Sequence, residues 1–415
     1  MKRPLKIALL GRNFDWAGGA ELLRVLANAL LFEADHHQLR LFLLLPVRNK
    51  VDNFTDLRRN IRNTAASLIR HGRFSLLKRE PVFGHVFRDY FKNIDGIVQP
   101  VEYNEETGLI PALRRIEADV VMPAAAPLRQ SFPFPWVGYI YDLQHKYLPD
   151  YFSARECLDR DIHFATMLRD AKAVIVTSKS VKDDIDKFFP KRECEVFNLP
   201  FSAAPVSTWL EDGNADLLAR YKLPSRYFLI SNQFWIHKSH ITAFRALAML
   251  VNDHGCADLH IVCTGKMEDY RFPDHIEGLR QQVRELRIED NVHFLGHIPK
   301  LDQIAIMKEC LAVLQPTLFE GNPGGLSVYD AVSLGIPVIL SDIPVNREIE
   351  EEANLFYFKA GSVTDLAGKI TEFLKKNASR PSKQELVSRG KRRKELMGER
   401  IMEAVYYVMG KSHRA

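Results

Sequence analysis

Residues 316–342 read PTLFEGNPGGLSVYDAVSLGIPVILSD and place a glycine-rich turn between an apolar run and a helical pattern. The apolar run ends at Glu320, which is typical of a buried strand that leads into a loop. The segment LSVYDAVSLG after the turn has helical periodicity and ends at Gly335, and a second apolar run follows it. This order of strand, turn, helix and strand is the repeating unit of a parallel sheet.

The same alternation of apolar runs and helical patterns extends over the whole chain. Because each run is short and bounded by turn residues, we expect ten buried strands in two sets of five. The predicted strands cover residues 5–11, 39–47, 118–124, 136–142 and 173–178, then 226–232, 259–265, 291–296, 310–316 and 336–342. The fold class predicted from this pattern is α/β, with two Rossmann-like, doubly wound parallel-sheet domains.

The alternation is interrupted at residues 199–227, where proline, serine and alanine are frequent, and this interruption predicts the domain boundary. We expect ligands at the carboxyl ends of the strands, in a cleft between two such domains. The predicted organisation is an N-terminal Rossmann-like domain at 1–205, a linker at 206–224, a C-terminal Rossmann-like domain at 225–390 and a helix within 391–415 that returns to the first domain.

Composition indicates a globular protein, with 46% hydrophobic and 26% charged residues in 415. No apolar run is long enough for a membrane span and the N-terminus lacks a cleavable signal pattern, so we predict a cytoplasmic protein. The five cysteines form no Cys-x-x-Cys pair and are odd in number, so neither a disulfide framework nor a zinc site is indicated.

Positive charge is concentrated in residues 48–92, which hold eleven Lys or Arg against four Asp or Glu. The chain carries a net charge of +5, and this segment alone supplies +7. Its apolar residues from Phe54 to Leu68 fall at helical spacing beside arginines, as in a basic helix at an anionic membrane surface. One interpretation is therefore peripheral attachment to the inner face of the plasma membrane; the other is an ordinary insertion that packs on its domain. No nucleic-acid-binding module is visible.

The glycine turn in residues 321–325 predicts an anion site, because the first amides of the following helix are unpaired and the helix dipole favours negative charge. A phosphate or diphosphate would fit there. The acids on either side could accept hydrogen bonds from sugar hydroxyls. The alternative is a glycine-rich turn with two surface acids.

The segment from Asn291 to Glu348 resembles the C-terminal signature of the retaining glycosyltransferases of family 4, which share the two-domain GT-B fold. In that family a second Glu lies eight positions after the first, whereas here Asp330 lies ten after Glu320, which we interpret as a turn two residues longer. The resemblance implies that Glu320 binds the donor hexose and Asp330 the ribose. The turn residues implied to bind the donor, with amides of the last three on the diphosphate, are Gly321, Asn322, Gly324, Gly325 and Leu326.

The stretch LISNQFWIHKSH, residues 229–240, carries a second part of the implied site. The family has an Arg and, five residues later, a Lys that neutralise the leaving diphosphate. Lys238 matches the Lys, but Gln233 stands at the Arg position, so one positive charge is missing. Asn232, His237 or His240 could compensate for it. A solvated surface lysine is the alternative interpretation of Lys238.

Two N-terminal segments complete the resemblance. Gly18 and Gly19 stand at the start of a helical pattern, where the family places a glycine turn against the donor phosphate. Asp142 and His145 match two members of the family's His-Asp-x-x-His segment near the transferred sugar, whereas Tyr141 replaces the first His. A histidine bonded within the domain wall is the alternative for His145.

Two Asp-x-Asp triplets, residues 159–161 and 184–186, lie in charged helical patterns. Such triplets bind divalent metal in another glycosyltransferase fold, but here solvated helix faces are the favoured interpretation, and we predict no metal site.

The resulting hypothesis is a retaining, metal-independent hexosyltransferase without a cofactor. Its donor is a UDP- or GDP-linked sugar, its acceptor a carbohydrate or lipid-linked molecule, and its predicted catalytic residues are Glu320, Lys238 and His145. Two alternatives stay open: an epimerase or phosphorylase of the same fold, and a non-catalytic subunit that binds nucleotide sugar.

Overall fold

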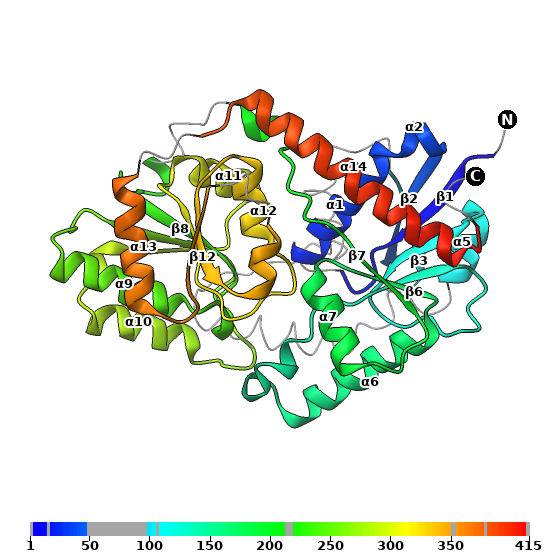
Figure 1. The fold of residues 1–415 in the computed structure, drawn as a ribbon, viewed down its shortest axis with the longest axis horizontal. Helices are drawn as coiled ribbons and strands as arrows, with labels where there is room; N and C mark the ends of the chain where they lie inside the picture. The colour runs from blue at the N-terminus through cyan, green and yellow to red at the C-terminus, as the bar shows by residue number, and fades with distance from the viewer. Residues whose placement is uncertain are drawn as a thin grey trace, which may run out of the picture. The chain divides into compact units, whose positions relative to one another are not determined.

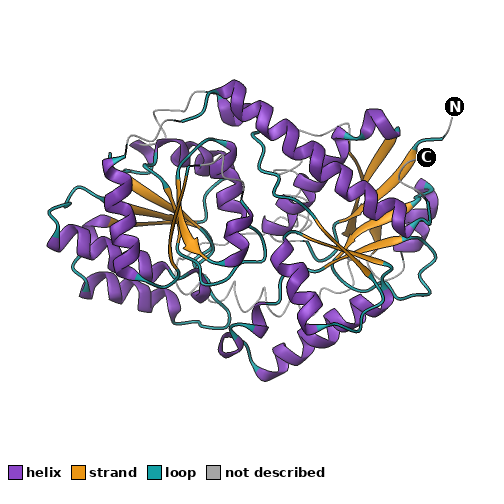
Figure 2. Cartoon of the chain, in the orientation of Figure 1, coloured by secondary structure: helices purple, strands orange, loops and turns teal. Residues whose placement is uncertain are grey.

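The computed structural model describes residues 3–14, 17–47, 98–104, 108–211, 219–349, 354–376 and 380–411. These residues form two sheets, each flanked by helices (Figure 2). The predicted basic helix in residues 48–92 lies outside the described residues. None of the described helices is both long and apolar enough to cross a membrane.

The first sheet has the strand order β3-β2-β1-β4-β5-β6-β7, and strands β1 to β5 pair in parallel. Its strands are β1 (Leu5–Leu10), β2 (Leu39–Val47), β3 (Val98–Asn104), β4 (Val120–Ala124), β5 (Trp136–Tyr139), β6 (Ala173–Val176) and β7 (Glu195–Asn198). The helices between them are α1 (Ala17–Phe32), α2 (Ala34–His37), α5 (Leu109–Ile116), η2 (Gln144–Lys146), η3 (Pro149–Tyr151), α6 (Ala154–Asp170) and α7 (Lys179–Phe188).

The second sheet has the order β10-β9-β8-β11-β12-β13 and is parallel throughout. Its strands are β8 (Tyr227–Ser231), β9 (His260–Thr264), β10 (Val292–Gly296), β11 (Val313–Gln315), β12 (Val338–Asp342) and β13 (Leu355–Lys359). The helices that follow β7 in the chain are η4 (Ser207–Leu210), η5 (Ile236–Lys238), α9 (His240–Asp253), α10 (His275–Glu285), η6 (Glu289–Asn291), α11 (Lys300–Glu309), α12 (Gly325–Ser333), η7 (Pro344–Glu348), α13 (Val363–Lys375) and α14 (Lys383–Val408).

The predicted fold class of two parallel-sheet, Rossmann-like domains is confirmed, but the prediction of five strands per sheet is wrong. All ten predicted strands are present. The three additional strands, β3, β7 and β13, each lie at an edge of their sheet. Edge strands are paired on one side only and need no continuous apolar run, and β3 exposes Gln99 and Pro100 while β13 exposes Lys359.

Both faces of the second sheet are buried under helices. Alternating side chains of β8 enter two separate cores: Phe228 and Ile230 pack with α9, α10 and α13, whereas Tyr227 and Leu229 pack with α11 and α12. Figure 1 shows these two groups of helices on opposite sides of the sheet. Burial on both faces explains why its strands read as continuous apolar runs.

By Cα proximity the chain divides into two compact units. One comprises Met1–Tyr139, Asp170–Val174 and Ile401–Ala415; the other comprises Ile140–Arg169 and Ile175–Arg400. This grouping does not follow the sheets strand by strand, so the domain boundaries predicted from the sequence stay predictions.

The last helix is longer than the sequence pattern predicted. It was expected from about residue 391, whereas α14 begins at Lys383. Ser382 starts it: its Oγ accepts a hydrogen bond from the Glu385 amide at 3.3 Å, and the Glu385 carboxylate accepts one from the Ser382 amide at 2.8 Å. This reciprocal cap satisfies two amides at the helix start. Near the other end, Tyr406 Oη lies 2.9 Å from His37 Nδ1.

Candidate functional site

The order in which the chain adds strands to the second sheet reverses between β8 and β11, which are neighbours although β9 and β10 lie between them in the sequence. In open parallel sheets the ligand crevice forms at such a switch point, at the carboxyl ends of the strands. Asn232 directly follows β8, and Gln315 is the last residue of β11. The Asn232 side-chain amide donates a hydrogen bond to Gln315 Oε1, which ties the two strand ends together.

A chain of side-chain hydrogen bonds leads from this point to two of the three predicted catalytic residues. Gln315 Nε2 donates to Glu320 Oε1 at 3.0 Å and to the Gly324 carbonyl at 2.6 Å. Glu320 Oε1 also forms an ion pair with Lys238 Nζ. The two side chains are only 12% (Lys238) and 9% (Glu320) exposed, so Lys238 is no solvated surface lysine. The structure thus brings Lys238, Glu320 and Asn232 together through Gln315, a residue that the sequence analysis missed.

The glycine turn leads into α12 as predicted, but two of its three predicted amide donors already have partners. The Gly324 amide donates to Asn346 Oδ1 at 2.7 Å, and the Gly325 amide donates to the Asn322 carbonyl at 3.1 Å. Gly324 has φ +68°, and a Cβ there would lie 2.5 Å from the Val328 side chain, so this position requires glycine. The Leu326 amide lies in the first turn of α12, where an N–H has no partner within its own helix.

The other two turn residues contact the end of β6 and the start of α7. Asn322 Oδ1 accepts a hydrogen bond from Thr177 Oγ1, and the Gly321 carbonyl accepts one from Ser178 Oγ at 2.8 Å. Their side-chain and carbonyl oxygens are therefore bound within the chain.

Asp330, the predicted ribose residue, is 3% exposed on α12. Its Oδ2 binds Lys300 Nζ at the start of α11. A ribose hydroxyl that reached Asp330 would therefore also meet Lys300. The sequence analysis did not predict this pairing, because the two residues lie thirty positions apart.

The residues proposed to replace the missing arginine carry no positive charge in this structure. The His240 ring is fully buried and stacks on Phe234, with ring centroids 4.3 Å apart, and burial lowers its pKa to about 3. Burial likewise lowers the pKa of His237 well below its ordinary value. Gln233 Oε1 accepts a hydrogen bond from Trp235 Nε1 at 2.5 Å.

His145 has both ring nitrogens engaged. Arg160 Nε donates to Nδ1 at 3.0 Å, so the proton is on Nε2, which donates to Asp161 at 2.8 Å. Burial lowers the pKa of His145, which keeps the ring neutral. Arg160 also binds Tyr141 Oη at 3.0 Å and the Asp142 carboxylate, so one arginine that the sequence analysis missed orders the whole predicted segment.

The remaining predicted positions have ordinary surroundings. Gly18 and Gly19 lie in the first turn of α1, which begins at Ala17.

Within the described residues, no group of three or more His, Cys, Asp or Glu is arranged to hold a metal ion. The acids of the Asp-x-Asp triplets bind other side chains: Asp159 with Arg155, Asp161 with His145 and Lys146, Asp184 with Tyr147, and Asp186 with Lys182 and Arg192.

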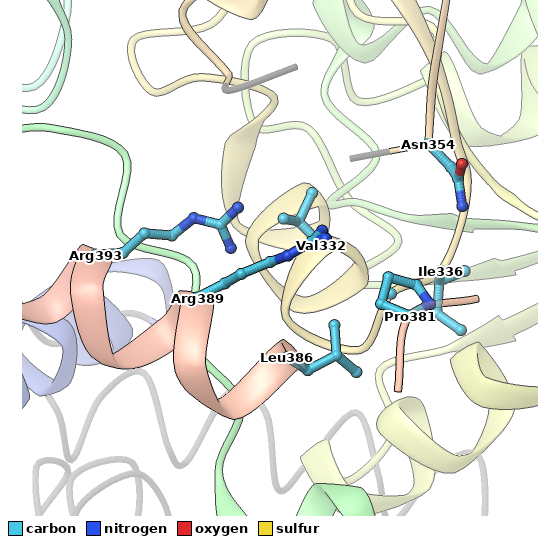
Figure 3. Close-up of a pocket in the computed structure, with 8 residues that line it drawn as sticks. Val332, Ile336, Asn354, Pro381, Leu386, Arg389 and Arg393 are labelled. Atoms are coloured by element: carbon cyan, nitrogen blue, oxygen red, sulfur yellow. The ribbon is translucent and has the colours of Figure 1, made fainter. Parts of the chain in front are cut away.

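The pocket in Figure 3 lies at the opposite end of α12 from the glycine turn. Arg389 and Arg393 extend from α14 toward Val332 (Figure 3). None of the predicted site residues lines it; the lining residues are Val332, Gly335, Ile336, Asn354, Pro381, Leu386, Arg389 and Arg393.

The buried histidine behind Lys238 makes stability depend on pH. The pKa of His240 is about 3 in the folded chain and about 6.5 in the unfolded chain. Between pH 3 and pH 6.5 the unfolded chain therefore binds a proton that the folded chain does not, and this protonation favours unfolding. The contribution of His240 therefore falls by about 1.4 kcal/mol per pH unit as the pH drops below 6.5. The free energy of unfolding is measured with urea at pH 7, 6, 5 and 4. In His240→Leu its decrease with falling pH should be smaller by this amount per pH unit. His254→Gln, at an exposed position, serves as the control. An identical slope in His240→Leu and the parent chain contradicts this account.

Comparison with known proteins adds to this geometry. Residues 220–393 match the family described as glycosyl transferases group 1. The O-antigen chain mannosyltransferase RfbU of Salmonella typhimurium (strain LT2) is 26% identical over 221 residues, which cover 52% of this chain and 55% of RfbU. The chain spans about half the length of the curated relatives it matches.

Two solved structures share the fold over almost the whole chain. Sucrose-phosphate synthase from Thermosynechococcus elongatus has a TM-score of 0.59 at 15% identity, covering 98% of this chain and 97% of that one. Anabaena HepE in complex with UDP-glucose has a TM-score of 0.56 at 16% identity, covering 98% of both chains. These likenesses identify the fold as that of GT-B glycosyltransferases. The family match covers residues 220–393, and the likeness in fold extends over almost the whole chain.

Proposed function

We propose that this protein is a retaining glycosyltransferase of family 4 that moves a hexose-like sugar from a UDP- or GDP-linked donor to a carbohydrate or lipid-linked acceptor. The observation that carries the proposal is the buried Lys238–Glu320 pair beside the glycine turn, at the switch point of the second sheet. The name of RfbU, a mannosyltransferase of O-antigen chains, supports a role in cell-surface polysaccharide synthesis. The UDP-glucose in HepE supports a nucleotide-sugar donor.

The donor would bind with its diphosphate at the start of α12. Lys238 and the Leu326 amide are the groups proposed to meet its oxygens, and the Glu320 carboxylate would accept hydrogen bonds from the hexose hydroxyls. Gln315 Nε2 donates hydrogen bonds both to Glu320, the proposed hexose contact, and to the Gly324 carbonyl in the glycine turn. These bonds would keep the hexose and diphosphate subsites at a fixed distance. Asp330, paired with Lys300, is the proposed ribose contact.

The chemistry proposed for this site is stabilisation of a leaving group. As the bond between sugar and diphosphate breaks, negative charge develops on the diphosphate, and a fixed cation stabilises that charge more than it stabilises the intact donor. The structure pairs Lys238 with Glu320, so a bound donor would exchange one anionic partner of Lys238 for another. The proposal assigns this charge to Lys238 rather than to a metal ion, so a chelator should leave turnover unchanged.

His145 is proposed to act by position. Its ring is neutral and bound on both sides, so its contribution would be to hold Arg160, Tyr141 and Asp142 in place near the transferred sugar. A cytoplasmic location, with peripheral attachment through residues 48–92, is proposed on the sequence alone.

A donor screen tests the proposal. Thermal unfolding is measured with UDP, GDP and their glucose, galactose, mannose and N-acetylglucosamine conjugates, and stabilising donors are then assayed for turnover. We expect one nucleotide to raise the melting temperature, since a ligand at a hundred times its dissociation constant stabilises by about 2.7 kcal/mol. NMR of the product should show the anomeric configuration of the donor.

Each alternative has its own result. Stabilisation without turnover on any acceptor favours a non-catalytic subunit, and an epimerised donor or released sugar phosphate favours the epimerase or phosphorylase. No stabilisation by any nucleotide contradicts the proposal.

A further inference from the structure

Arg271 lies in the loop between β9 and α10 and is almost completely enclosed. Its side chain is 9% exposed. Three aromatic rings surround the guanidinium, with distances from Cζ to the ring centroids of 4.5 Å for Phe152, 4.9 Å for Trp235 and 5.7 Å for Tyr270. The charge is thus held in place by ring faces, which attract a cation but accept no strong hydrogen bond.

The guanidinium has no hydrogen-bond partner among the described residues, and its Nε is buried. Asp269 Oδ1 forms an ion pair with Nε at 3.6 Å, which is too long for a hydrogen bond. The two Asp269 oxygens accept backbone hydrogen bonds of 3.0 Å from the amides of Ile236 and Arg271. The buried Nε–H is therefore left without an acceptor, and no hydrogen bond from the Nη groups is found among the described residues. Burying a charged group without hydrogen bonds is costly, so this arrangement indicates a ligand.

A second arginine at the same ring shows the contrast. Arg160 Cζ lies 5.2 Å from the centroid of Phe152, yet its guanidinium binds Tyr141 and Asp142, and its Nε binds His145. The Arg160 guanidinium thus has hydrogen-bond acceptors within the chain, whereas the buried Nε of Arg271 has none among the described residues.

Arg271 borders the loop that carries Lys238. Asp269, its neighbour, binds the amide of Ile236, and Ile236 begins the short helix η5 that ends at Lys238. Burial lowers the pKa of His237, and the charges of Lys238 and Arg271 lower it further.

We propose that Arg271 binds a phosphoryl oxyanion of a substrate and forms, with Lys238, a two-cation anion subsite. A guanidinium can donate two parallel hydrogen bonds to two oxygens of a phosphate. Its planar faces can stay against the aromatic rings while the N–H groups at its edge donate these hydrogen bonds. The choice of a phosphoryl anion rests on the proposed function. The phosphate has two sources: the diphosphate of the nucleotide donor, or a phosphate on the second substrate.

The test compares Arg271→Met and Arg271→Lys with the parent chain by calorimetry. Methionine keeps an unbranched apolar side chain among the rings, and Arg280→Gln, on the exposed part of α10, is the control. The probes are UDP, GDP, inorganic pyrophosphate, and inorganic phosphate with the binding nucleotide at saturation. Unfolding of each variant without ligand is measured in parallel.

If the donor supplies the phosphate, Arg271→Met weakens nucleoside diphosphate and pyrophosphate about 10- to 100-fold, as expected for one or two charge-assisted hydrogen bonds. Arg271→Lys should recover part of the loss, and Arg280→Gln should lose nothing. If the second substrate supplies the phosphate, Arg271→Met keeps its affinity for the nucleotide. It then loses the binding of inorganic phosphate that the parent chain shows with nucleotide bound. Unchanged affinity for every probe in Arg271→Met overturns the proposal, as does a parent chain that binds none of them.

These outcomes separate the subsite from the proposed function. A parent chain that binds pyrophosphate through Arg271 but no nucleoside diphosphate keeps the anion subsite and loses the sugar-transfer proposal. A chain that binds nucleotide and transfers sugar equally well without Arg271 keeps the proposed function alone.

Discussion

Replacing Lys238 by alanine is expected to lower sugar transfer by about a hundredfold or more, mainly in kcat. Lys238 is the cation next to Glu320, and the charge that it would stabilise is larger in the transition state than in the bound donor. A loss of this size is typical when a fixed donor to a developing anion is removed. Initial rates at saturating and limiting donor give the split between kcat and KM.

Two controls accompany this prediction. Lys266→Ala removes an exposed lysine, 62% exposed and paired with Glu268, and should leave the rates unchanged. Because Lys238→Ala leaves Glu320 buried without its partner, urea unfolding of Lys238→Ala is compared with that of Lys238→Met/Glu320→Gln, in which both charges are removed. Near-normal kcat in folded Lys238→Ala rejects Lys238 as the group that stabilises the leaving diphosphate.

Gly265→Ala is expected to destabilise the protein by several kcal/mol and to disturb the site. Gly265 follows β9 with φ +135°, and a Cβ there would lie 2.0 Å from the Asn232 carbonyl oxygen. Alanine disfavours this backbone conformation, and the Asn232 backbone would have to move, which would disturb the hydrogen bond from its side chain to Gln315. Large destabilisation by a single substitution is expected from strain of this kind.

The matched control for Gly265 is Gly278 in α10. A Cβ at Gly278 meets nothing within 4 Å, so Gly278→Ala should stabilise the protein by about 0.4 to 1 kcal/mol. Urea unfolding measures both variants, and donor affinity reports the state of the site. Equal stability of Gly265→Ala and the parent chain contradicts the predicted close approach.

The sequence pattern predicts the buried strands well because parallel strands covered on both faces are continuous apolar runs. It fails at β3, β7 and β13, where one side of the strand has no neighbour and polar residues such as Gln99 and Lys359 are tolerated. It also placed the start of α14 eight residues late, because the Ser382–Glu385 cap was not used as a signal.

Parts of the candidate site could be predicted because they follow strand ends in a recognisable order, as Lys238 and Glu320 do. Gln315 could not, since a single glutamine at the end of an apolar run has no distinguishing spacing. Arg271 and Lys300 matter through partners far away in the chain, which only folding brings near. The reverse error occurs at His240. The sequence analysis expected this polar residue to compensate for the missing arginine, whereas it stacks on Phe234 inside the core.

The most direct measurement of the central claim is a crystal structure of the protein with its nucleoside diphosphate bound. The account predicts the diphosphate at the start of α12, with an oxygen within hydrogen-bond distance of Lys238 Nζ and another at the Leu326 amide. A nucleotide whose phosphates lie away from the switch point of the second sheet, with the Lys238–Glu320 pair undisturbed, would contradict it.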